Sequence, residues 1–376
     1  MKLEPFKEVL KRQVPIDIGK PIPMIIYEMD HPKNCGDPWI GAYSNHGFWY
    51  KFSDGTNDDF EKISAFDSIV ARAFDSDSYK MDYDSLKVWQ TIPPCNYRFI
   101  IAKNQSNELL GSIMITYFHN FAIIGAYYVI EEYRHSGIGS KLFNESLKNL
   151  NSNETVIFHS TSNLANKCHR FGLTTSFLQQ EWKFATYEIS NPSAFPTLQN
   201  TKVTIIKYSN LSEAELTELL KYDARITNLN RDVWLKNWLK RENFNTYVAF
   251  KEKQVIGYGC SREVAGGYVL PLLIGPLYAD NFETASALLY ASLEKYYNPD
   301  DDYDWDPDIF AIYRRNVYFI VPEQNTQMIA LMEKLKGETG TLKKDRLYYV
   351  TQTTDNLPNV NFNKIFSVSD MHMSII

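Results

Sequence analysis

The same order of predicted elements occurs twice along this chain, and this repeat limits the fold more than any other feature. Each copy has a strand hairpin, a further strand, a helix and a closing strand. Matching landmarks are spaced almost constantly: Gly257 follows Gly111 by 146 residues, Ala279 follows Val129 by 150, and Gly337 follows Gly172 by 165. This spacing predicts two whole domains in tandem, which suits a chain of 376 residues. We place the domains at residues 1–190 and 200–376.

Each copy combines strands with helices. The predicted elements of the first copy are a leading arm over 1–45, a helix over 59–74, strands over 97–103, 109–118 and 121–130, a helix over 140–150 and a strand from Val156. Those of the second are a strand over 203–207, helices within 213–239, a hairpin over 247–261, a strand over 268–278, a helix over 283–296 and a strand over 317–321. A strand, loop, helix and strand in succession form a βαβ unit, which requires a parallel pair. The predicted fold class is therefore α/β, with a mixed sheet.

Charge and composition exclude several classes of function. The net charge of −6 lacks the basic surface typical of a protein that binds nucleic acid or an anionic membrane. The chain has no apolar run near the roughly 18–20 residues of a membrane span, and its first residues are charged. Its four cysteines show no metal-ligand spacing. We expect a cytoplasmic protein with no nucleic-acid partner, no membrane partner and no metal.

The most informative motif comes after the strand that ends at Val129. Gly137 and Gly139 flank one residue at the start of the next helix. Such glycines let consecutive backbone amides point outward, and the positive end of the helix dipole adds to their attraction for a pyrophosphate. The alternative is a plain glycine-rich turn between strand and helix.

The run Arg134-His135-Ser136-Gly137-Ile138-Gly139 resembles the signature of the GNAT superfamily of acyl-CoA-dependent N-acyltransferases, Arg/Gln-x-x-Gly-x-Gly/Ala. The resemblance implies that CoA, with acetyl-CoA as the co-substrate, binds here. It further implies that the fourth and fifth strands splay and that the pantetheine pairs with the fourth strand near Val129. The pyrophosphate would then lie on the amides from Arg134 to Ser140.

The helix after the next strand carries the candidate catalytic residues. The family has there an Asn, a Tyr that protonates the leaving thiolate, and a closing Gly-Phe. This chain has Asn163, which we count with the CoA-binding residues, and counting back from Gly172 places Cys168 at the Tyr position, with His169 beside it. Both side chains can donate a proton. The alternative for Cys168 is small buried packing.

The base that deprotonates the amine is not evident, because residues 121–130 contain no Asp or Glu. A water molecule held by Tyr127, Tyr128 or His119 is one solution. Ordinary packing or surface exposure is the alternative for each of these residues.

The second copy resembles the C-terminal acetyltransferase-like domain of YitH-type proteins, notably in the run from Tyr268 to Ala285. The two-domain layout also resembles that of a group of uncharacterised nematode proteins. Asp280 and Glu283 lie at the mouth of this copy's helix, where carboxylates satisfy the dipole and repel a pyrophosphate. The acidic run over 298–308 is either a solvated loop or a site for a cation or basic partner.

These observations lead to two hypotheses of different class. The first is an acyl-CoA-dependent N-acyltransferase that acts, through its N-terminal domain, on a small-molecule or peptide amine. The alternative is a degenerate, non-catalytic acyltransferase that binds CoA or a protein partner. The missing Tyr and the missing strand carboxylate favour the alternative.

Overall fold

The computed structural model describes residues 41–43, 49–56, 59, 97–118, 120–148, 150, 154–176, 181–192, 203–264, 271–297, 316–357 and 359–370. The leading arm up to residue 40, His119, the acidic run over 298–308 and nearly all of the helix predicted over 59–74 lie outside these residues.

The first half has the predicted alternation of strands and helices. Its elements are β1 (Gly41–Tyr43), β2 (Trp49–Asp54), β3 (Tyr97–Lys103), β4 (Leu109–Tyr117), β5 (Phe121–Val129), α4 (Ile138–Ser146), β6 (Thr155–Thr161), α5 (Ser162–Cys168) and β7 (Lys183–Ser190). The helix α4 begins two residues before the predicted start, because Gly137 is its N-cap. The motif glycines therefore lie at the cap and within the first turn.

The second half repeats this order. Its elements are β8 (Thr204–Lys207), α6 (Glu213–Thr227), α7 (Asp232–Leu239), β9 (Phe244–Lys251), β10 (Gln254–Glu263), β11 (Leu272–Ala279), α8 (Phe282–Tyr297), β12 (Val317–Pro322), α10 (Thr326–Lys336), β13 (Thr341–Thr353) and β14 (Ile365–Ser367). The predicted helical stretch 213–239 consists of two helices, and the first starts with a capping box between Ser212 and Glu215.

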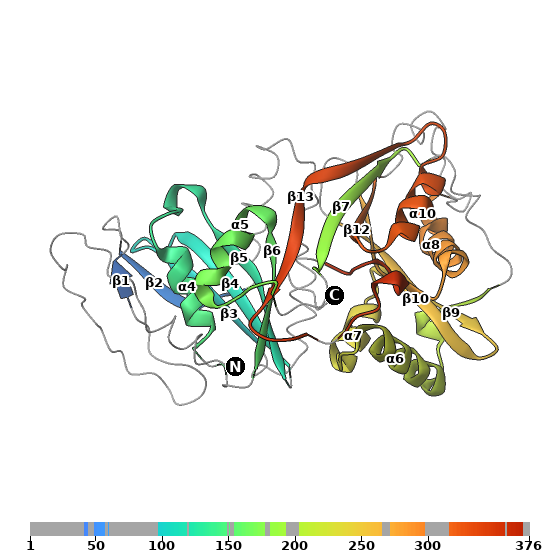
Figure 1. Ribbon diagram of the computed structural model, residues 1–376, viewed down its shortest axis with the longest axis horizontal. Coiled ribbons are helices and arrows are strands. Elements are labelled where there is room, and N and C mark those ends of the chain that lie inside the picture. Colours follow the sequence, from blue (N-terminus) through green and yellow to red (C-terminus); the bar gives the residue numbers. More distant parts are fainter. Residues whose placement is uncertain are drawn as a thin grey trace.

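All the described strands belong to one mixed sheet, in the order β1-β2-β3-β4-β5-β6-β13-β7-β12-β11-β10-β9-β8, with β14 paired to β11. Among these strands, the pairs β5–β6 and β11–β12 are parallel. The two halves exchange strands at the centre of the sheet: β13 of the second half pairs with β6, and β7 of the first half pairs with β12. Figure 1 shows β7 and β13 side by side between the halves, where they also pair with each other.

Two equivalent glycines confirm the repeat. Gly111 lies opposite Val129 in the β4–β5 pair, and Gly257 lies opposite Ala279 in the β10–β11 pair. A Cβ atom at Gly111 would lie 2.6 Å from the backbone oxygen of Tyr128. At Gly257 it would lie 2.8 Å from that of Tyr278. Each half therefore needs glycine at this position, because any side chain would meet the neighbouring backbone.

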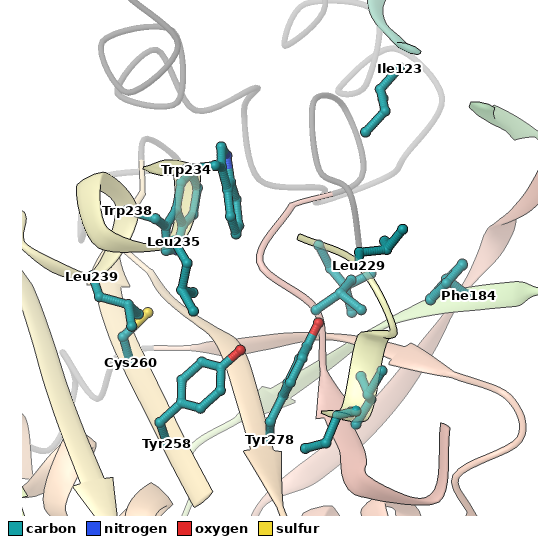
Figure 2. Close-up of a cluster of buried hydrophobic side chains, with 14 of the residues drawn as sticks. Ile123, Phe184, Leu229, Trp234, Leu235, Trp238, Leu239, Tyr258, Cys260 and Tyr278 are labelled. Atoms are coloured by element: carbon teal, nitrogen blue, oxygen red, sulfur yellow. The ribbon is translucent and has the colours of Figure 1, made fainter. Parts of the chain in front are cut away.

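Helices cover the sheet on both faces. The side chains of α4 pack with Cys168 and one face of β3 to β6, and those of α8 and α10 pack with the matching face of the second half. The opposite face carries a cluster that spans both halves and includes α6 and α7. Figure 2 shows part of it, with Ile123 and Phe184 from the first half and Leu229, Trp234 and Tyr278 from the second.

Candidate functional site

The strands β5 and β6 separate part of the way along their length. They pair from Phe121 with Thr155 to Ile124 with Phe158, and then both strands continue without pairing to each other. A bulge in β5 accompanies the separation: Ala126 has a φ of 45°, and its carbonyl oxygen accepts a hydrogen bond of 2.8 Å from Ser112 Oγ. We call the space between residues 125–129 of β5 and 159–161 of β6 the first fork. It is the splay that the GNAT resemblance implies.

The glycine loop lies at the open end of the first fork. The Nε atom of Arg134 donates a hydrogen bond of 3.1 Å to the carbonyl oxygen of Val129, the last residue of β5. Ser136 is buried, and its hydroxyl donates to the Tyr133 carbonyl at 2.5 Å. Gly137 caps α4 with a φ of 89°, a left-handed conformation that favours glycine. These contacts hold the loop against the end of β5.

The first turn of α4 suits an anion. Its N-cap is a glycine, which has no side chain to accept from the first amides, and its first turn holds no acidic residue. The amides of Ile138, Gly139 and Ser140 therefore lie at the positive end of the helix dipole with neither a capping side chain nor a competing carboxylate. A helix start of this kind can accept a phosphate group, and the pyrophosphate site at this loop stays a prediction.

Gly139 has a second role that the sequence did not indicate. A Cβ atom there would lie 2.5 Å from the hydroxyl oxygen of Tyr127 and 3.2 Å from Cγ2 of Val129. Burial, with a smaller contribution from the neighbouring Cys168, raises the pKa of Tyr127 to about 12. The Tyr127 side chain thus lies between β5 and the start of α4, and it requires the absence of a side chain at Gly139.

The other predicted residues are distributed between core and surface. Ile138 is buried, whereas His135, Ser140, Asn163 and His169 are exposed. Cys168 is buried, and its Sγ donates to the carbonyl oxygen of Leu164 at 3.5 Å. Burial raises the pKa of its thiol to about 12. The surroundings of Cys168 favour packing, and the catalytic roles of Cys168 and His169 stay predictions.

The strands β11 and β12 separate at the matching place, which we call the second fork. They pair from Leu272 with Val317 to Ile274 with Phe319 and then diverge. Here the chain fills the space itself: β14 pairs with β11, and the Ser367 hydroxyl donates to the Ile274 carbonyl at 2.7 Å. On the other side, the Ile320 amide donates to Ser367 Oγ at 3.0 Å, and the Val368 amide donates to the Ile320 carbonyl at 2.9 Å. A segment of this chain therefore bridges the second fork.

The helix after β11 also differs from α4. The side chain of Asn281 accepts a hydrogen bond of 2.9 Å from the Thr284 amide, and Glu283 lies in the first turn. Asp280 accepts from Lys364 Nζ at 2.8 Å and from the Tyr222 hydroxyl at 3.2 Å. The predicted acidic mouth is present, but Asn281 makes the capping hydrogen bond, while Asp280 holds the lysine that precedes β14.

Two further findings concern the described residues alone. No helix among them is both long enough and apolar enough to cross a membrane. Within the same part of the chain, no group of three or more His, Cys, Asp and Glu side chains is arranged to hold a metal ion.

Comparison with known proteins connects this geometry to a family. Residues 63–172 match the acetyltransferase (GNAT) family, and residues 219–299 match an acetyltransferase (GNAT) domain. An uncharacterised protein of Caenorhabditis elegans is 21% identical over 222 residues, which are 57% of this chain and 68% of that protein.

Two solved structures resemble the whole arrangement. A putative acetyltransferase from Pyrococcus horikoshii is 15% identical, with a TM-score of 0.59, over 92% of this chain and 99% of that one. A tandem GNAT protein from the clavulanic acid biosynthesis pathway is 12% identical, with a TM-score of 0.55, over 82% of this chain and 99% of that one. At these identities the likeness shows the fold alone.

Proposed function

We propose that this chain, which carries two GNAT acetyltransferase domains in tandem, is an acyl-CoA-dependent N-acyltransferase whose reaction takes place in the first domain. The observation that carries the proposal is the difference between the two forks. The first fork ends at a helix whose first amides have no capping side chain, whereas β14 bridges the second and Asn281 caps its helix. These differences support the first domain as the one that binds the CoA thioester.

In this proposal acetyl-CoA binds along β5 and the start of α4. The pyrophosphate lies on the amides between Arg134 and Ser140, and the pantetheine pairs with β5 near Val129, whose carbonyl Arg134 holds. Asn163 contributes from α5. Catalysis comes mainly from orienting the amine against the thioester, while backbone amides polarise the thioester carbonyl.

The acceptor is a small-molecule or peptide amine. The relation of the second half to YitH-type domains, and of the whole chain to a nematode protein group, is part of the proposal. The resemblance to the Caenorhabditis elegans protein supports the nematode relation.

A second candidate function is a CoA-binding module without turnover. The burial of Cys168 favours it, because a thiol with its pKa raised to about 12 is a weak acid in place of the expected Tyr. The two functions differ in one measurable property, the release of CoA in the presence of an amine.

The test uses the full-length chain and two matched variants at the second residue of each helix. Gly139→Val places a branched side chain against Tyr127, and we expect it to abolish acetyl-CoA binding in calorimetry, whereas Glu283→Val in α8 leaves binding unchanged. We expect the parent to bind one equivalent and to release CoA with at least one amine of a broad panel. Unaltered binding by a folded Gly139→Val protein would contradict the site. Binding without CoA release would establish the module.

A further inference from the structure

His159 occupies a distinctive position at the first fork. It directly follows Phe158, the last residue of β6 that pairs with β5, so it is the first residue of β6 inside the fork. Its side chain is 5% exposed. The matching residue of the second half is Ile320, which directly follows Phe319 at the end of the β11–β12 pairing. The open fork therefore has a titratable side chain where the bridged fork has an aliphatic one.

The imidazole lies on the face of the sheet away from α4 and α5. Successive side chains of a strand point to opposite faces, and Phe158 belongs to the α4 core. The His159 ring packs edge-on against Phe184 of β7, with ring centroids 5.6 Å apart. Phe184 belongs to the cluster that spans both halves (Figure 2).

A residue from the second half fixes the orientation of this ring. Thr351 of β13 lies directly opposite His159, and its Oγ1 is 2.7 Å from Nδ1 of the imidazole. When Nδ1 carries the proton and donates it to this hydroxyl, Nε2 is the basic nitrogen. The exchanged strand thus positions the ring.

If the proposed function holds, the two faces of the first fork have different tasks. CoA enters from the side of the glycine loop and α4, so the acceptor amine approaches the thioester carbon from the opposite face. We propose that His159 is the base on that face and that Thr351 is its positioning residue. This assignment replaces the water molecule that the sequence analysis offered as one solution in the absence of a strand carboxylate.

The proposed step conserves atoms, protons and charge. Nε2 of His159 accepts one proton from the acceptor's ammonium group, and the neutral amine attacks the thioester carbon. The C–N bond forms, the C–S bond breaks, and a second proton passes from the amine nitrogen to the CoA sulfur. The imidazolium then returns its proton to water. The products are the N-acyl amine, CoA and one released proton.

The experiment measures kcat/KM of the full-length protein with an alkylamine, protonated at neutral pH, and with hydroxylamine, largely neutral there. We expect His159→Gln to lower kcat/KM for the alkylamine by about 10²–10⁴-fold and for hydroxylamine much less, because a neutral nucleophile needs no base. The acetyl-CoA dissociation constant should stay unchanged. Thr351→Val should lower kcat/KM for the alkylamine by about tenfold, because the ring loses the partner that orients it, and Thr351→Ser should restore it.

Three outcomes would overturn the assignment. Equal losses with both nucleophiles would make His159 a structural residue, and full alkylamine activity in His159→Gln would show that another group is the base. If His159→Gln does not fold, an unchanged kcat/KM for the alkylamine in a folded Thr351→Val protein would contradict the roles of His159 and Thr351. A parent that binds acetyl-CoA but releases CoA with no amine of the broad panel refutes the proposed function itself.

Discussion

The two forks are built on the same backbone plan and differ in the elements that come after each strand pair. In both, the parallel strands stop pairing after three or four residue pairs, and a helix begins near the end of the first strand. The first helix starts at Gly137 without a capping side chain, while Asn281 caps the second. The second fork also contains β14. The comparison teaches that a shared fold does not imply a shared site. The second fork differs from the first by the three-residue strand β14 and by the Asn281 side chain that caps its helix.

The largest expected effect is the loss of stability that follows removal of the β14 side chain in the core. Phe366 is fully buried against the α8 and α10 side of the sheet. Phe366→Ala should lower the free energy of unfolding by about 3–5 kcal/mol, as measured by urea denaturation, because it leaves a large cavity. Acetyl-CoA stoichiometry should stay at one.

Phe143→Ala is the matched change in the first half, since Phe143 is a buried residue of α4 that packs edge-on against Tyr127. We expect a similar loss of stability, together with weaker acetyl-CoA binding. A Phe366→Ala protein that is as stable as the parent and binds a second equivalent of acetyl-CoA would contradict this distinction between the forks. In that case β14 would be a removable cover over a working site.

A smaller effect concerns the glycines that occupy equivalent positions in the two halves. Gly111→Ala and Gly257→Ala each force a Cβ atom toward a backbone oxygen. Each change should lower the free energy of unfolding by about 1–3 kcal/mol, as expected for overpacking. Thermal and urea denaturation of both variants provide the measurement. A negligible change in unfolding free energy at one of the two positions would show that the packing around these glycines differs between the halves, although their strand registers match.

The smallest expected effect compares the buried thiols of the two halves. Burial raises the pKa of both Cys168 and Cys260 from 9.0 to about 12. Above pH 9 the unfolded chain loses these protons and the folded chain keeps them, so stability falls as pH rises toward 12. The slope is about 1.4 kcal/mol per pH unit for each thiol.

Urea denaturation between about pH 8 and 10.5 should show a shallower decline for Cys168→Ala and for Cys260→Ala than for the parent. Tyrosines titrate in this range too, but they do so in parent and variants alike. A parent and a Cys168→Ala variant that lose stability in parallel would show that this thiol ionises in the folded protein.

The local spacing of apolar and turn-forming residues was sufficient to predict most of the fold. The strands over 97–103 and 109–118, the helix over 283–296 and the strand over 317–321 match β3, β4, α8 and β12 closely. Their spacing was also sufficient to predict the tandem repeat. The glycine loop could be placed because Gly137 requires a left-handed conformation and precedes a helix, both of which are local properties.

Interactions distant in sequence account for what was missed. The exchange of β7 and β13 depends on pairing between residues that lie far apart in the chain, which periodicity does not encode. The strand β14 has three residues, too few for a recognisable alternation. His159 has no motif around it, and its position becomes informative only when the register shows that β5 leaves β6 after Phe158. The only signal in the sequence was a histidine inside a strand of apolar residues.

The exchanged strands also constrain how this protein is made. His159 and Thr351 touch although they lie 192 positions apart in the sequence, so β6 cannot gain β13 as its second neighbour until residues 341–353 have left the ribosome. Until then the first half presents an unpaired strand edge, the kind of surface that promotes association between nascent chains. Translation that stops early would remove β13 from a domain encoded long before the stop. The folding of the first half therefore depends on synthesis of the second, and a truncation that removes β13 would leave β6 without its partner on that side of the first fork.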